Sequence, residues 1–121
     1  MDDRRIVWLS VTGSGNETAA HLRQTPRMTL MFCAFEGDAL TLRVYGSARV
    51  IHPGDADWDS LSAHFPAYAG ACNIFDLSIE LVTTACGTGV PEMQVIRPRA
   101  DTELLPFYED MAPKASARIG R

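Results

Sequence analysis

The feature that most constrains this chain is a succession of strand, glycine-turn and helix signals near its N-terminus. The stretch Arg5–Val11 is rich in β-branched and aromatic residues, which favour a strand. Gly13 and Gly15 follow, and glycine adopts the backbone angles that a tight turn demands. A helix is expected over Asn16–Gln24, because Pro26 biases the residue before it away from the helical region. This segment therefore predicts a strand, a turn and a short helix in that order.

Two interpretations of the turn stay open. In one, the turn is an anion site, since a glycine-rich turn leading into a helix exposes backbone amides and the positive end of the helix dipole to a phosphate. In the other, the amides are occupied. Ser14 and Glu17 have the spacing of a capping box, and Asn16 is a competing cap. Glu17 would also repel a phosphate. The motif matches neither a Walker A loop nor a dinucleotide-binding fingerprint.

Length and charge restrict the class of protein. A chain of 121 residues with 46% hydrophobic content is expected to form a single globular domain with one core. A formal net charge of -4 argues against nucleic acid and against an anionic membrane as partners, because both repel an acidic chain. No transmembrane span or signal peptide is recognisable, so the cytoplasm is the expected compartment.

The rest of the chain alternates between strand and helix patterns. Strands are expected at residues 28–35, 40–52 and 73–84, and helices at residues 56–65 and 101–111. The short polar link at residues 36–39 predicts a hairpin, so the strands beside it should be antiparallel. In the strand that follows, polar and apolar residues alternate as in a sheet with one buried face, and Gly46 marks a bulge or a close approach. Asp55 is expected to cap the helix after it.

These elements predict an α+β fold with an antiparallel sheet. Hairpin connections favour local antiparallel pairing over a doubly wound parallel arrangement. Four strands leave two open edges and an incompletely covered core, so something else is expected to complete the sheet.

No residue is assigned a catalytic role, and no metal is predicted. The three cysteines are expected to be reduced thiols, because an odd number at wide spacing fits neither a disulfide framework nor a C-x-x-C site. Cys33 is expected to be a small core residue. Cys86 lies in a loop-like setting without a neighbouring cation, which argues against a reactive thiolate. The candidates for a zinc site lack its spacing; they are His21, His52 and His64 together with Cys86.

Several motifs occur in an order that resembles a known family. They are Thr12-Gly13-Ser14-Gly15-Asn16-Glu17-Thr18, His21-Leu22, the run from Pro26 to Gly37, Leu42-Arg43-Val44-Tyr45-Gly46 and Cys86-Gly87-Thr88-Gly89-Val90-Pro91. With these motifs the chain resembles the pyridoxamine 5′-phosphate oxidase-like, FMN-binding split-barrel proteins. It is most similar to the subgroup that carries GSGNET and CGxGVP motifs. The resemblance extends over about Asp2 to Arg97.

The resemblance implies a small antiparallel split barrel that forms a homodimer, with FMN in a cleft between the subunits. It also implies an oxidoreductase that acts on a small-molecule substrate. Residues 1–97 would form a partial FMN-binding domain, and residues 98–121 a C-terminal helical segment and tail. The residues expected to bind the cofactor, with its phosphate at the strand, turn and helix, are Thr12, Gly13, Ser14, Gly15, Asn16, Thr18 and Arg43.

The sequence also departs from the family pattern. The N-terminal helix and first barrel strands of the family, with their Ser-Pro-Lys-Gly motif, have no counterpart here. The chain is therefore expected to be a fragment, to have a misassigned start, or to have its barrel rebuilt by a partner chain. The Ser-Arg-Lys triplet that grips the phosphate in the oxidases aligns with Asn16, Glu17 and Thr18. Weaker FMN binding, or a different ligand, is expected, because charge-assisted hydrogen bonds are about twice as strong as neutral ones. The basic C-terminal substrate motif is not recognisable in residues 98–121, so oxidation of pyridoxamine phosphate itself is not expected.

Three functional hypotheses remain. The first is an FMN-dependent oxidoreductase, in which the flavin supplies the hydride chemistry and the protein supplies position and electrostatics. The second is a homodimer that binds FMN, a deazaflavin or haem without catalysis. The third is a truncated structural remnant without a cofactor.

Overall fold

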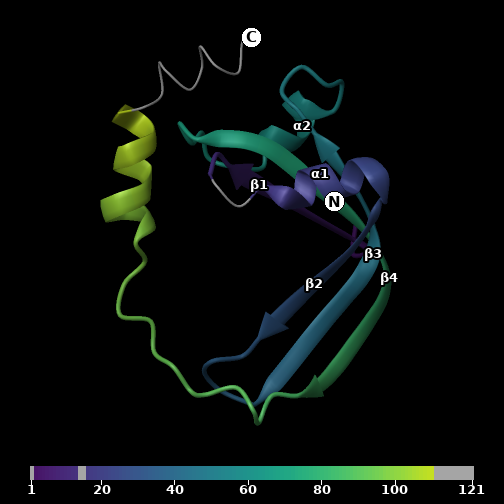
Figure 1. Cartoon of the computed structure of the whole chain (residues 1–121), viewed down its shortest axis with the longest axis vertical. Helices are drawn as coiled ribbons and strands as arrows, with labels where there is room; N and C mark the ends of the chain where they lie inside the picture. Colours follow the sequence, from purple (N-terminus) through teal and green to yellow (C-terminus); the bar gives the residue numbers. More distant parts are fainter. Residues whose placement is uncertain (1, 14–15, 111–121) are drawn as a thin grey trace.

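The computed structural model describes residues 2–13 and 16–110, and within them the chain forms one antiparallel sheet with short helices (Figure 1). The strand order is β1-β4-β3-β2, and all neighbours are antiparallel. The strands are β1 (Arg5–Val11), β2 (Arg27–Cys33), β3 (Leu40–Ile51) and β4 (Ala71–Cys86). The helices are α1 (Glu17–Gln24), α2 (Trp58–Ser62) and the π-helix η1 (Ala100–Leu104), which continues as α-helix over residues 105–110. The predicted α+β fold with an antiparallel sheet, consistent with a partial split barrel, is confirmed.

The predicted irregularity at Gly46 is present. The register between β3 and β4 shifts between Tyr45 and Gly46, so that Glu80 of β4 has no direct partner on β3. A Cβ atom on Gly46 would lie 1.9 Å from the carbonyl oxygen of Ser78. This contact is far shorter than van der Waals separation, so the backbones approach there as only glycine allows.

Two small cores lie on opposite faces of the sheet. The α1 side contains Val44, Ala48 and Leu77, with Ile6, Trp8, Leu22, Met28, Leu30, Leu42 and Ile79 packed against them. The α2 side contains Ile51, Leu61 and Ile74, with Val7, Leu9, Trp58 and Phe65 packed against them. The prediction of a single core is therefore wrong. The prediction that β3 has one buried face is wrong at the end of that strand, where Ile51 is buried on the opposite face. Successive residues point to opposite faces, and α2 covers the face that Ile51 occupies.

The observed ends of α1 and α2 correct one prediction and confirm another. Asp55 does not cap α2, because its carboxylate accepts a hydrogen bond of 2.8 Å from the backbone amide of His52. That bond closes a turn in which Gly54 has a φ of 97°, and α2 begins only at Trp58. At the end of α1, Thr25 is extended, with φ -140° and ψ 116°, as expected of a residue before proline.

The half of the sheet distant from both helices is apolar and uncovered. Figure 1 shows β2, β3 and β4 extending together away from α1 and α2. On β2, the adjacent residues Met31 and Phe32 are 57% and 51% exposed, and on β4, Leu81 and Val82 are 56% and 49% exposed. Because neighbouring residues of a strand point to opposite faces, both faces of this half are open. Within residues 2–13 and 16–110, no further strand pairs with the outer edge of β1 or β2, as four strands predict.

The C-terminal part of the described chain returns toward the end of β1, where Tyr108 contacts Thr12. Residues 87–99 form no helix or strand and connect the far end of β4 to the helical residues 100–110 (Figure 1). The helix predicted at residues 101–111 is thus confirmed as far as residue 110, and Met111 lies outside the described residues. No helix in the described ranges is long and apolar enough to cross a membrane.

Candidate functional site

The predicted anion turn leaves β1 at Thr12 and enters α1 at Asn16. The amide of Thr12 donates a 2.7 Å hydrogen bond to the carbonyl oxygen of Gly70, so this amide is not free for a ligand. Asn16 occupies the N-cap position of α1, but its side chain caps no helical amide. Instead, its Nδ2 donates to the carbonyl oxygen of Gly13 at 3.2 Å. Ser14 and Gly15 lie outside the described residues, and the predicted capping box of Ser14 with Glu17 lies outside them with Ser14.

A pocket opens between the start of α1 and the sheet. Its volume is about 350 Å³, and it is lined by Trp8, Ser10, Asn16, Thr18, Met28, Thr29, Leu30 and Phe75. The rings of Trp8 and Phe75 are stacked, with centroids 5.2 Å apart and planes 20° from parallel. The lining thus combines hydroxyl and amide groups with a pair of aromatic rings, and none of the described residues in it carries a charge.

The structure brings together some of the predicted cofactor-binding residues and separates one. Asn16 and Thr18 both line the pocket, and Thr12 and Gly13 belong to the turn that leads to them. Arg43 does not line it. In β3, Arg43 pairs with Met31 and Thr83 and lies, by strand alternation, on the face opposite the core residue Val44. This position does not bring the Arg43 cation to the pocket.

Of the eight residues that line the pocket, sequence reasoning predicted only Asn16 and Thr18 as cofactor-binding residues. Ser10, Thr29 and Phe75 are not among the residues predicted to bind the cofactor. A signal was present for Ser10, because it lies two residues after Trp8 in a strand and therefore on the same face. No such signal exists for Thr29 and Phe75, which reach the pocket only through the order β1-β4-β3-β2.

The side chains that line the pocket fit some features of a phosphorylated aromatic ligand. The hydroxyls of Ser10, Thr18 and Thr29 can donate to phosphate oxygens, and the stacked rings offer an aromatic surface. Among residues 2–13 and 16–110, no lysine or arginine lines the pocket, so the hydrogen bonds that these lining residues could donate to a phosphate would be neutral. Neutral hydrogen bonds of this kind are about half as strong as charge-assisted ones.

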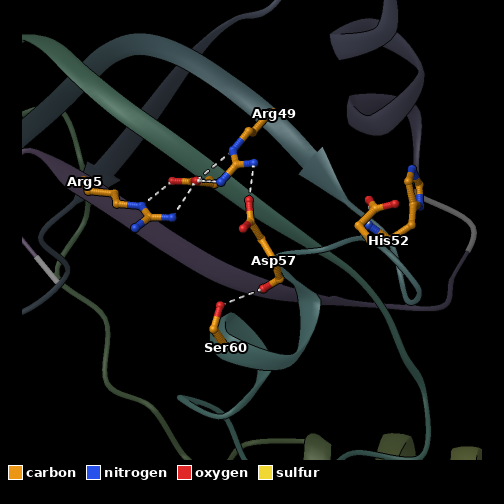
Figure 2. A network of polar contacts seen from close by, with 7 residues as sticks. Arg5, Arg49, His52, Asp57 and Ser60 are labelled. Carbon is orange, nitrogen blue, oxygen red and sulfur yellow. Dashed lines mark hydrogen bonds and ion pairs between the residues drawn. The ribbon is translucent and has the colours of Figure 1, made fainter.

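The arginines of the other face form a separate polar network (Figure 2). Arg5 donates to both carboxylate oxygens of Asp76 at 2.7 Å, and Arg49 donates to Asp76 Oδ2 at 3.0 Å and to Asp57 Oδ2 at 2.7 Å. The Asp76 side chain is 7% exposed. The hydrogen bond from Arg5, followed by that from Arg49, lowers the pKa of Asp76. Two arginines are balanced by two aspartates, so this network joins β1, β3, β4 and the start of α2 and leaves no excess positive charge for an anion.

The positions of the cysteines correct two predictions, because Cys33 belongs to neither core and Cys86 does not lie in a loop. Cys33 and Cys72 are half-buried, and Cys86 is exposed at the last position of β4, not in a loop. The Sγ atom of Cys86 lies 3.6 Å from Thr88 Oγ1. This hydrogen bond lowers the pKa of the thiol. Within residues 2–13 and 16–110, no three His, Cys, Asp or Glu side chains are grouped as metal ligands.

Comparisons with known proteins agree with the resemblance. The family described as pyridoxamine 5′-phosphate oxidase matches residues 1–100. A pyridoxamine 5′-phosphate oxidase family protein of Aspergillus flavus, ustO, is 33% identical over 89 residues, which are 72% of this chain and 36% of the fungal protein. The chain therefore spans about a third of the length of this curated relative. No solved structure matches the chain.

Proposed function

The chain belongs to the pyridoxamine 5′-phosphate oxidase family, and from this premise we propose that it binds FMN in the pocket beneath the start of α1. Membership supports a flavin-binding fold in general. The observation that carries the narrower proposal is the lining of the pocket. Asn16 and Thr18, two of the residues that correspond to the phosphate-binding triplet, lie there beside the stacked rings of Trp8 and Phe75.

The proposed roles follow from the chemistry of each side chain. Thr18 and Asn16 would donate hydrogen bonds to the phosphate, and Ser10 extends this polar side of the pocket. Trp8 would offer its ring to the flavin. A bound flavin supplies hydride and electron transfer to the protein. We propose on this basis an oxidoreductase that acts on a small molecule.

The test is a titration of the 121-residue chain with FMN and with riboflavin, followed by flavin fluorescence. FMN is expected to bind more tightly than riboflavin, because only FMN carries a phosphate. Thr18→Val should weaken FMN binding about two- to ten-fold, since a neutral hydrogen bond contributes roughly 0.5–1.5 kcal/mol, and should leave riboflavin unchanged. Thr84→Val, an exposed position on β4, is the matched control and should change neither.

Each other result has a defined meaning. Equal binding of FMN and riboflavin contradicts a phosphate site at the turn. Binding of haem or a deazaflavin in place of FMN favours the non-catalytic binding protein, and no binding favours a structural remnant. Catalysis is tested separately, by asking whether a nicotinamide donor reduces the bound flavin and a defined acceptor reoxidises it.

We also propose that the chain forms a homodimer through the uncovered half of its sheet. Support comes from the apolar residues exposed on both faces there, because soluble proteins rarely leave such patches open. Leu81→Lys places a charge on this surface and should shift the chain toward monomers in analytical ultracentrifugation. Lysine at Ser60, an exposed position on α2 away from the patch, is the control. A wild-type chain that sediments as a monomer would contradict the dimer.

A further inference from the structure

In the described part of the chain, the aromatic side chain of Tyr108 connects the C-terminal helical segment to the turn after β1. Tyr108 is 7% exposed, whereas Leu104 and Phe107 in the same segment are 40% and 56% exposed. The hydroxyl of Tyr108 donates a hydrogen bond to the carbonyl oxygen of Thr12. Its ring lies against Gly70, where an added Cβ atom would be 2.5 Å from the ring carbons. Tyr108 is therefore the most deeply buried of the described residues in this segment, and it contacts the turn directly.

Both polar groups of the Thr12 backbone are hydrogen-bonded. The amide of Thr12 donates to Gly70, and the carbonyl oxygen accepts from Tyr108. The next residue, Gly13, accepts the side-chain amide of Asn16. Asn16 in turn lines the pocket. A continuous series of contacts thus leads from the Tyr108 hydroxyl, through the turn, to the polar wall of the pocket, although Tyr108 itself does not line it.

We infer that Tyr108 is a positioning residue, which fixes the glycine turn so that Asn16 and Thr18 can meet a phosphate group. The inference rests on the proposed FMN site and deepens it. It assigns the C-terminal segment a part in building the phosphate end of that site. Small backbone displacements in a binding turn weaken all of its hydrogen bonds to a ligand, because those bonds depend steeply on distance and angle.

The test uses Tyr108→Phe, which removes the hydroxyl and keeps the ring. FMN binding should weaken about three- to ten-fold, as the loss of one hydrogen bond allows, while riboflavin binding stays unchanged. A purely structural role would not distinguish these two ligands. Phe107→Leu, at the exposed neighbouring position, is the control and should bind both flavins as the wild type does.

Hydrogen exchange of the Thr12 amide, followed by NMR, provides a readout that needs no ligand. Exchange at Thr12 should accelerate in Tyr108→Phe and not in Phe107→Leu, because only the former releases the Thr12 carbonyl. Unchanged exchange at Thr12 overturns the inference, whether or not flavin binds. Equal weakening of FMN and riboflavin also overturns it. A wild-type chain that binds neither flavin overturns the proposed function and the phosphate role of Tyr108 together, and faster exchange would then identify Tyr108 as an anchor only.

Discussion

Asp76→Asn removes one negative charge from the middle of the sheet while it keeps the size of the side chain. Asp76 lies on β4, between β1 and β3, and is 7% exposed at its side chain. It accepts hydrogen bonds from Arg5 and Arg49. Asparagine keeps only one acceptor oxygen and turns an N–H group toward guanidinium donors, so at least one arginine loses its partner.

The magnitude follows from how far water reaches the network. Breaking a fully buried ion pair by removal of one partner costs about 3–5 kcal/mol. Here the Arg5 and Arg49 side chains are 30% and 54% exposed, so water can solvate them after the change. We therefore expect Asp76→Asn to lower the free energy of unfolding by about 2 kcal/mol, between the buried and the surface cases.

The assay is urea unfolding, with Asp57→Asn as a matched control. Asp57 makes an equally short contact, 2.7 Å, with the same Arg49, but the two side chains are 51% and 54% exposed. Removing a surface ion pair costs less than about 1 kcal/mol. Equal losses for the two variants would refute the argument that burial of Asp76 sets the energy of the network.

The pH dependence gives a second, independent check. Hydrogen bonding by Arg5, followed by Arg49, lowers the folded-state pKa of Asp76 below its ordinary value of 3.8. The carboxylate therefore stabilises the fold fully above that value, and this contribution is lost as the pH falls through the folded-state pKa. The difference between wild type and Asp76→Asn should be constant from about pH 7 to 5 and shrink below about pH 4. A difference that persists unchanged at about pH 3 would contradict the ionic role of Asp76.

Three further outcomes are expected. Trp8→Leu should weaken FMN binding about two- to ten-fold, because the aromatic contact contributes roughly 0.5–1.5 kcal/mol. Trp58→Leu changes a half-buried tryptophan on the other face of the sheet and should leave FMN binding unchanged. If flavin titrations showed that Trp58→Leu weakens binding and Trp8→Leu does not, the flavin would bind elsewhere. Gly46→Ala should lower stability in urea unfolding by about 3 kcal/mol, because its Cβ would meet Ser78 backbone, whereas Gly89→Ala, with open space around it, should stay within about 0.5 kcal/mol. In mass spectrometry after brief alkylation, the exposed Cys86 should react before the two half-buried cysteines, because hydrogen bonding to Thr88 lowers its thiol pKa; slower reaction at Cys86 would contradict this.

Local sequence determined most of the elements of this protein and the hairpin pairing of β2 with β3. The apolar and polar alternation in β3 and β4, the link before Leu40 and the proline after α1 each act within a few residues. Such signals therefore predicted four antiparallel strands and the bulge at Gly46. Order-specific motifs predicted the family, which the comparisons confirmed over residues 1–100.

Only the tertiary structure decided what those elements face. Asp55 could cap a helix by its position, but the turn at Gly54 brought its carboxylate to the amide of His52 first. Arg5 and Asp76 meet across 71 residues of sequence, and Tyr108 and Thr12 across 96. Contacts of this range depend on strand order and on the path of the C-terminal segment, which no local pattern encodes. For the same reason, the sequence predicted Asn16 and Thr18, but only the sheet placed Trp8 and Phe75 beside them.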